Sequence, residues 1–107
     1  MPVTHLTNGD ELDALLRDNG RVVVDFFSTE CPPCEALASV FEKISEKYPD
    51  VKFIKIMRQD NRDLAESFTV MSSPTVLFFK QGKMQDKRLC GRIFEAELDQ
   101  AVNELMA

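Results

Sequence analysis

The sequence is short of cysteine, and the cysteines that it has cannot make a disulfide scaffold. Three cysteines in 107 residues are too few to hold a small protein together through disulfide bonds. Because the number is odd, at least one thiol is left free or available to a partner. The chain must therefore fold around an apolar core, and its length suits a single domain over residues 1–107.

Basic charge and long apolar runs are also lacking. The net charge of −5 argues against nucleic acid as a partner, because phosphate groups are bound by basic surfaces. No apolar run approaches the roughly 20 residues that span a bilayer, so we expect no membrane association. The N-terminal stretch MPVTHLTNGDEL shows no secretory signal, and we expect a cytoplasmic protein.

The apolar residues that are present predict alternating strands and helices. Strand-like runs cover residues 22–28, 51–57 and 75–80, and helical spacing covers residues 34–48, 60–68 and 94–106. Gly82 between two strand-like runs indicates a hairpin. The expected order is strand, helix, strand, helix, strand, helix, strand, strand, helix. This order predicts parallel β-α-β crossovers followed by an antiparallel hairpin and a closing helix.

Several polar residues predict where helices begin and end. Asn8, with Glu11 three residues later, is typical of a helix N-terminus, and Gly20 follows the expected end of the same helix. Asp60 is the expected N-cap of the helix that follows the strand at 51–57.

The chemistry-bearing motif is Cys31-Pro32-Pro33-Cys34. A residue before proline avoids the helical region, so Cys31 and Pro32 are expected to be extended and the helix to begin near Pro33. Cys34 then lies in the first turn and Cys31 just ahead of it. The free N–H groups and the positive end of the helix dipole favour the thiolate form of Cys31. The spacing also allows a small, reversible disulfide ring.

A Cys-x-x-Cys pair can also be half of a zinc site, here completed by Cys90 and His5. Structural zinc sites usually bring two close ligand pairs, however, and these two residues are isolated in the sequence. The motif lies at a strand-to-helix junction, where a parallel sheet forms its sites. This position favours a redox pair over a zinc site or two inert cysteines, so we expect no metal and no other cofactor.

The segments VVVDFFSTECPPC and SSPTVLFFKQGK, with Gly91 further on, resemble the thioredoxin family. The resemblance covers nearly the whole chain in the same order, and the Cys-x-x-Cys joined to a downstream Ser-Pro-Thr makes it specific. It implies the α/β thioredoxin fold, in which helices flank a central mixed sheet. It also implies a thiol–disulfide oxidoreductase, in the first place a reductase of protein disulfides.

The same resemblance implies roles for individual residues. Cys31 matches the attacking thiol of the family, and Cys34 matches the resolving thiol. Pro74 matches the cis-proline that packs beside the cysteine pair and helps to bind substrate. Asp25 matches the buried acid, and Lys55 matches the lysine that approaches it from the neighbouring strand.

Asp25 also stands out without the resemblance, because it interrupts the apolar run VVVDFF. A buried, isolated carboxylate is costly, so its pKa should rise, and it can then accept the proton of Cys34. Lys55 would moderate that rise. The alternatives are that Asp25 reaches water at the strand end and that Lys55 extends to solvent.

The substrate groove is expected around the cysteine pair and the cis-proline, with Met71 and Ser72 leading into it. Its expected residues are Glu30, Pro32, Pro33, Ser73, Pro74 and Gly91.

The motif departs from the family pattern. Pro-Pro replaces the common Gly-Pro, Glu30 replaces a tryptophan, Glu35 replaces a basic residue and Ser39 replaces a kinking proline. The glutamates suggest an acidic rim that selects partners with neutral or basic surfaces; alternatively, both simply point to solvent. Cys90, beside Gly91, is expected to be a bystander, with a regulatory thiol as the alternative.

The expected partners are protein disulfides and an electron-donating enzyme similar to thioredoxin reductase, and we expect a monomer. An adaptor that only binds, a redox protein dedicated to one partner, and an oxidase or isomerase remain as alternatives.

Overall fold

The computed structural model describes residues 2–107, and these form five strands and four helices in the predicted order. In chain order the elements are β1 (Val3–Leu6), α1 (Gly9–Asp18), β2 (Arg21–Phe27), α2 (Pro32–Lys47), β3 (Lys52–Met57), α3 (Arg62–Ser67), β4 (Thr75–Lys80), β5 (Lys83–Cys90) and α4 (Glu95–Met106). None of the helices in this part of the chain is long and apolar enough to cross a lipid bilayer.

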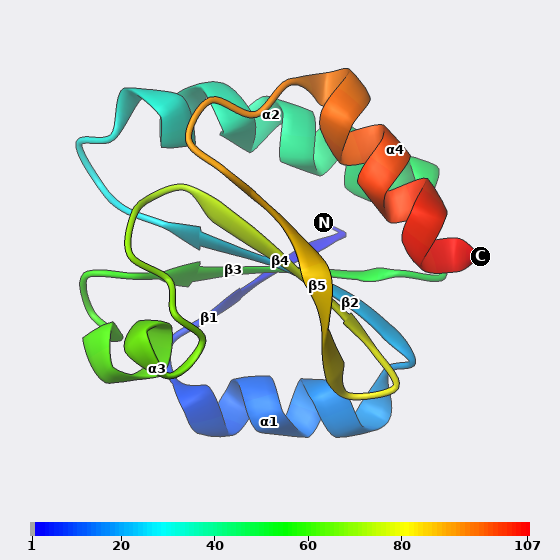
Figure 1. Cartoon of the computed structure of the whole chain (residues 1–107), viewed down its shortest axis with the longest axis horizontal. Helices are drawn as coiled ribbons and strands as arrows, with labels where there is room; N and C mark the ends of the chain where they lie inside the picture. The colour runs from blue at the N-terminus through cyan, green and yellow to red at the C-terminus, as the bar shows by residue number, and fades with distance from the viewer. Residues whose placement is uncertain (1) are drawn as a thin grey trace.

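The strands form one mixed sheet in the order β1-β3-β2-β4-β5 (Figure 1). β1, β3 and β2 run parallel, whereas β4 pairs antiparallel with β2 and β5 antiparallel with β4. The predicted crossovers and the closing hairpin are therefore confirmed. β2 lies in the middle of the sheet and is covered on both faces, which accounts for its nearly continuous apolar sequence.

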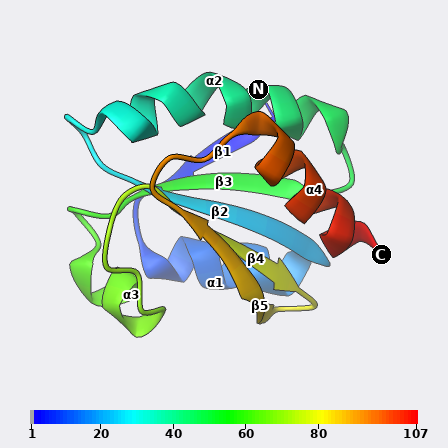
Figure 2. The same ribbon diagram turned by 45° about the horizontal axis from the view of Figure 1, so that its top comes forward.

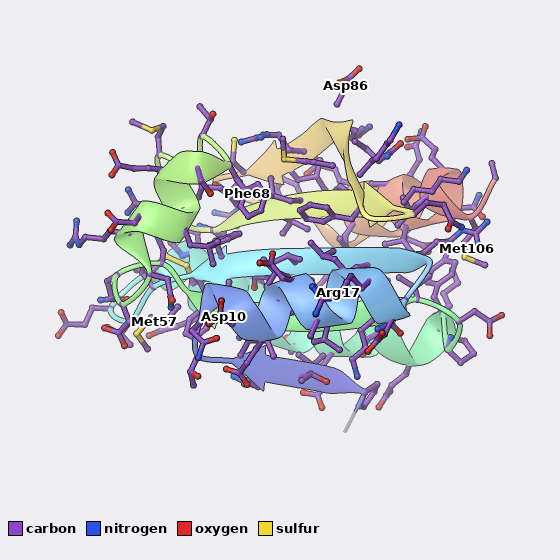
Figure 3. All side chains as sticks on the ribbon, turned by 90° about the horizontal axis from the view of Figure 1, so that it is seen from below. Asp10, Arg17, Met57, Phe68, Asp86 and Met106 are labelled. Carbon is purple, nitrogen blue, oxygen red and sulfur yellow. A yellow bond between two sulfur atoms is a disulfide. The ribbon has the colours of Figure 1, made fainter. Side chains whose placement is uncertain are left out.

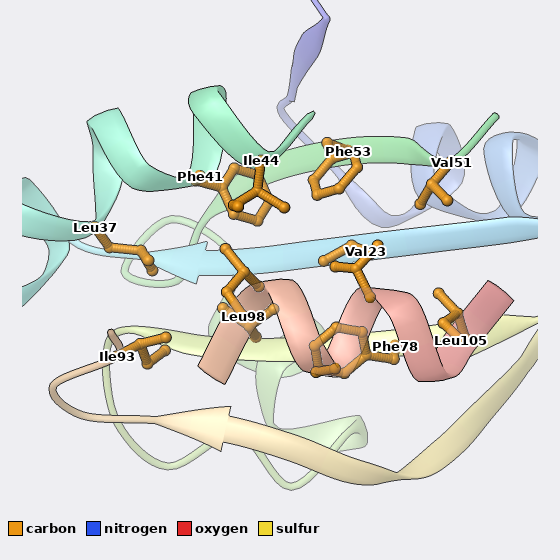
Figure 4. Close-up of a cluster of buried hydrophobic side chains, with 13 residues drawn as sticks. Val23, Leu37, Phe41, Ile44, Val51, Phe53, Phe78, Ile93, Leu98 and Leu105 are labelled. Carbon is orange, nitrogen blue, oxygen red and sulfur yellow. The ribbon is translucent and has the colours of Figure 1, made fainter. Parts of the chain in front are cut away.

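The sheet divides the core into two layers. Helices α2 and α4 cover one face, and α1 and α3 cover the other (Figures 1 and 2). Val23, Phe53 and Phe78 pack against α2 and α4 (Figure 4). Val22 and Val24 belong to the opposite layer. Because side chains alternate along a strand, Asp25 shares a face with Val23 and is directed to the side of α2.

The helix ends agree with the sequence in one place and differ in two. Asn8 caps α1, and its Oδ1 accepts a hydrogen bond from the N–H of Glu11 at 3.0 Å. The N-cap of α3 is Asn61, so the prediction of Asp60 is wrong. The Asn61 N–H donates a hydrogen bond to the Arg58 carbonyl at 3.0 Å, so residues 58–61 form a turn. Asp60 lies inside this turn, one residue before the N-cap. Helix α2 begins at Pro32, one residue before Pro33, because the restriction on a residue before proline is only a bias.

Four connecting segments meet at one end of the sheet, where Figure 2 shows them converging. They are the loop from β2 to α2, the loop from β3 to α3, the approach to β4 and the exit from β5. The Arg58 N–H donates to the Phe27 carbonyl at 2.7 Å, and the Gly91 N–H donates to the Pro74 carbonyl at 3.1 Å. Both cysteines of the Cys-x-x-Cys motif lie at this end.

Candidate active site

Cys31 and Cys34 are joined by a disulfide bond, with their Cα atoms 5.2 Å apart. Cys31 is the N-cap of α2 and has extended backbone angles. Its Sγ accepts a hydrogen bond from the Cys34 N–H at 3.3 Å, so sulfur takes the place of the usual capping oxygen. Cys31 is half-exposed, whereas Cys34 is only 4% exposed. A partner can therefore reach Cys31 much more easily than Cys34.

The Ser73–Pro74 segment lies directly beside this disulfide. The peptide bond between the two residues is cis, and Pro74 is buried. The Ser73 carbonyl oxygen is 3.6 Å from Cys31 Sγ. The hydroxyl groups of Ser73 and Ser28 form a hydrogen bond of 2.6 Å. Ser73 therefore connects the proline loop to the loop that carries Cys31.

Gly91 borders the site on the side of β5. Its N–H holds the Pro74 carbonyl, and its φ of 73° lies in the left-handed region that favours glycine. Cys90 ends β5 opposite Thr75 and is exposed as a free thiol. The chain thus places Cys90 next to the loop of Pro74, whereas the disulfide is formed by the other two cysteines.

Asp25 is fully buried, and neither of its carboxylate oxygens has a hydrogen-bond partner. Burial raises the pKa of Asp25 from 3.8 to about 7, and the positive charge of Lys55 opposes this rise. The alternative that Asp25 reaches water at the strand end is wrong, because the side chain has no exposed surface. Asp25 is therefore a buried carboxyl whose pKa lies near neutrality.

Lys55 is the register partner of Asp25 on β3, but its ammonium group packs elsewhere. Lys55 Nζ lies 4.7 Å from the centre of the Phe27 ring, a cation–π distance. In residues 2–107 no ion pair within 4.0 Å joins Lys55 to Asp25. Lys55 therefore acts on Asp25 only through space, which explains why burial has the larger effect on the pKa of Asp25.

The residues around the cysteines are open to solvent. Glu30, Pro32 and Glu35 are exposed, and Pro33 is half-exposed. Glu30 has a φ of 55°, so the chain turns sharply just before Cys31. Glu35 lies in the first turn of α2, where a negative charge interacts favourably with the helix dipole.

The alternative zinc set is not assembled. His5 lies on β1 and Cys90 ends β5, and these strands form opposite edges of the sheet. Within residues 2–107 no three His, Cys, Asp or Glu side chains gather as metal ligands.

The same fold and the same cysteine motif occur together in a known family of proteins. A sequence model described as "Thioredoxin" matches residues 3–104. The chain belongs to the thioredoxin family. The thioredoxin of Mycoplasmoides gallisepticum is 41% identical over 85 residues, which are 79% of this chain and 85% of that protein.

Solved thioredoxin structures show the same fold. A mutant thioredoxin from Halobacterium salinarum has a TM-score of 0.92 at 28% identity, covering 98% of this chain and 91% of that one. Oxidised mitochondrial thioredoxin 3 from Saccharomyces cerevisiae has a TM-score of 0.87 at 29% identity, covering 95% and 94%. Family membership and the Cys31–Cys34 disulfide show that the protein is a thiol–disulfide oxidoreductase with the thioredoxin fold.

Three residues of this thioredoxin site were not predicted from the sequence. Gln59 binds Thr29 twice: its Oε1 accepts from the Thr29 N–H at 2.7 Å, and its Nε2 donates to Thr29 Oγ1 at 2.9 Å. Arg58 Nη2 donates to the Met71 carbonyl at 3.1 Å. Arg58 and Gln59 could have been suspected from their position, because they directly follow β3, and the carboxyl end of β3 lies beside that of β2.

Proposed function

We propose that the protein reduces disulfide bonds in other proteins, with Cys31 as the attacking thiol and Cys34 as the resolving thiol. The observation that best supports this assignment is that Cys31 is more exposed than Cys34 at the start of α2. Cys31 combines access with an N–H donor on its sulfur, which favours the thiolate that reacts.

The reaction transfers two electrons from the reduced pair to the substrate. The Cys31 thiolate attacks one sulfur of the substrate disulfide, and the other substrate sulfur leaves as a thiolate. Cys34 then attacks Cys31 Sγ in the mixed disulfide. This step forms the Cys31–Cys34 bond and releases the second substrate sulfur.

Asp25 is the proposed proton acceptor for Cys34. Burial raises the pKa of Asp25 to about 7, so the carboxyl can take up a proton and release it again near neutral pH. Asp25 faces the layer of α2, in whose first turn Cys34 lies. In this proposal Lys55 limits how far the pKa of Asp25 rises.

The groove that receives the substrate chain is proposed along the converging loops. Ser73 and Pro74 form one wall beside Cys31, and Gly91 extends that wall. Glu30, Pro32 and Pro33 form the opposite wall.

The catalytic cycle also requires an electron donor. We propose an enzyme similar to thioredoxin reductase that reduces the Cys31–Cys34 disulfide after each turnover. The role suits a reducing compartment, for which we propose the cytoplasm, although thioredoxin 3 of S. cerevisiae is described as mitochondrial.

Three measurements test this proposal. Insulin reduction with dithiothreitol as the electron source should be accelerated by the natural chain. The Cys34→Ser variant should accumulate a mixed disulfide through Cys31, since the release step is blocked. In the reduced natural protein, iodoacetamide should alkylate Cys31 before Cys34; alkylation of Cys34 first would reverse the assigned roles.

A further inference from the structure

A small cavity lies next to the proposed substrate groove, between α3 and the segment that leads to Pro74. It has a volume of about 240 Å³ and is lined by Arg58, Arg62, Ala65, Glu66, Val70 and Met71. This volume is below the roughly 300 Å³ at which pockets for small ligands begin. Its size suits one side chain of a larger partner.

The cavity adjoins the site through direct contacts. Arg58 bridges two of the converging loops: its N–H donates to the Phe27 carbonyl and its Nη2 donates to the Met71 carbonyl. Met71 is two residues before Ser73, which spans at most about 7 Å of extended chain. The Ser73 carbonyl contacts Cys31 Sγ. A substrate chain that lies along Ser73 therefore reaches the cavity within a few residues of its disulfide.

The charges that line the cavity favour an anion. Within residues 2–107 neither Arg58 nor Arg62 forms an ion pair with a carboxylate. Arg58 Nε is buried and has no hydrogen-bond partner, so no acceptor in the described part of the chain is directed at this part of the guanidinium group. Planar guanidinium groups match the geometry of a carboxylate. Glu66 also lines the cavity, but the two arginines outnumber it.

The acidic residues at this end of the molecule lie mainly elsewhere. Glu30 and Glu35 belong to the loop and first turn around the cysteines. Asp60 and Asp63 line a neighbouring depression that Arg62 also borders. Glu30 and Glu35, the acidic rim expected from the sequence, therefore lie on the cysteine side of the groove.

We propose that this cavity is a subsite for an acidic side chain, Asp or Glu, that lies a few residues from the target disulfide of the protein substrate. The proposal rests on the proposed reductase function and specifies its substrate class. Arg58 and Arg62 supply the positive charge of the subsite.

The test uses synthetic disulfide peptides that are identical except at one residue. Glu, Gln or Lys is placed two, three or four residues from the target cysteine, on either side, and kcat/KM is measured with dithiothreitol as the electron source. For at least one position the Glu peptide should react roughly tenfold faster than the Lys peptide at low salt. The preference should shrink at 0.5 M salt because the charges are screened.

Variants of the protein distinguish an effect of the subsite from an effect of net charge on the reduction rate. Arg62→Glu should invert the preference towards the Lys peptide, and it leaves the hydrogen bond from Arg58 to Met71 in place. Arg58→Gln with Arg62→Gln should remove the preference. Arg17→Glu, on α1 (Figure 3), changes the net charge by the same amount as either of these variants and should keep the natural ratio.

The outcomes are distinct. Equal reduction of all peptides by the natural chain, or an unchanged ratio in Arg62→Glu, overturns the subsite. If the Gln peptide is not reduced at all, the proposed reductase function fails instead.

Discussion

Strands β2 and β5 belong to the same sheet but stand in opposite environments. β2 lies between β3 and β4, and five of its seven residues are buried. β5 is an edge strand, and none of its eight residues is buried. β2 carries Asp25 and leads to Cys31, whereas β5 carries Asp86 and ends at Cys90. An aspartate therefore occurs in each strand, buried in one and exposed in the other, and a cysteine follows β2 and ends β5.

This difference indicates that the surroundings of these side chains, rather than their residue types, determine their chemistry. Asp86 is exposed to water, whereas burial raises the pKa of Asp25 to about 7. Cys90 is a free thiol at the edge, whereas Cys31 lies at the N-terminus of α2 with a partner sulfur three residues away. The same substitution can be made in each of the two regions. Comparing the two variants then measures how much each environment contributes to turnover and to stability.

The largest difference is expected between the two cysteines. Cys31→Ser should reduce insulin-disulfide turnover to the uncatalysed rate, because no thiolate remains to attack. Cys90→Ser should keep turnover within about twofold, because serine is similar in size and the position is exposed. A large loss in Cys90→Ser would show that the edge thiol takes part in the reaction.

The next largest difference is expected between the two aspartates. Asp25→Asn should slow turnover at least about tenfold at pH 7, since the proton acceptor is lost, and should remove the step near pH 7 from the pH–rate profile. Asp86→Asn should leave the profile unchanged. A natural profile that is flat between pH 6 and pH 8 would contradict the role of Asp25.

Asp25 also predicts how stability depends on pH. Its pKa is about 7 in the folded state and about 3.8 when unfolded, so the unfolded chain loses this proton first. The free energy of unfolding should therefore be highest below pH 3.8 with respect to this group and should fall as the pH rises towards 7. The full difference corresponds to about 4 kcal/mol.

Denaturant unfolding of Asp25→Asn can check this dependence. Above pH 7 the variant should be more stable than the natural chain by up to about 4 kcal/mol, and the gap should narrow at lower pH. A constant gap between pH 5 and pH 8 would show that Asp25 does not titrate as described.

Packing provides a third comparison. Phe26 on β2 is fully buried and contacts the Phe68 ring with centroids 6.2 Å apart. Phe26→Ala should lower the free energy of unfolding by about 3–5 kcal/mol because it leaves a cavity. Met84 on β5 is 41% exposed, so Met84→Ala should cost about 0.5 kcal/mol or less. Chemical denaturation of both variants measures the contrast.

The site residues that could be predicted are those that stand out from the sequence immediately around them. Asp25 interrupts an apolar run, and two prolines separate Cys31 from Cys34. Each of these features can be recognised within a few residues. The order of the elements along the chain, the parallel crossovers and the closing hairpin were also predictable, because alternating strands and helices allow few topologies.

The features that the sequence did not reveal depend on long-range neighbours. Arg58 and Gln59 stand in a polar turn like many others, and they reach the site only because β3 pairs with β2. The Lys55 ammonium packs on Phe27, a choice of side-chain direction that strand register alone does not determine. The choice of N-cap for α3 is a local matter. Asp60 and Asn61 are both residue types that favour this position, and the turn that ends at Asn61 determines which of them occupies it.

The smallest effect is expected from the acidic residues beside the cysteines. Glu30 and Glu35 are exposed, so solvent and salt screen their charges. They should steer the approach of partners more than they change the final affinity. Replacing them by Glu30→Trp with Glu35→Lys should slow reduction of basic substrate proteins relative to acidic ones by about twofold to fivefold at low salt.

A control must carry the same change in net charge at a distance from the site. Asp13→Lys with Asp18→Asn adds the same three positive charges on α1, which covers the other face of the sheet (Figure 1). Because screened charges act over about 8 Å at physiological salt, this control should alter the ratio between basic and acidic substrates much less. Equal ratios for the two double variants would mean that net charge, rather than the position of Glu30 and Glu35, governs the encounter. An unchanged ratio in both would leave the two glutamates with only a local role, in which Glu35 stabilises the first turn of α2.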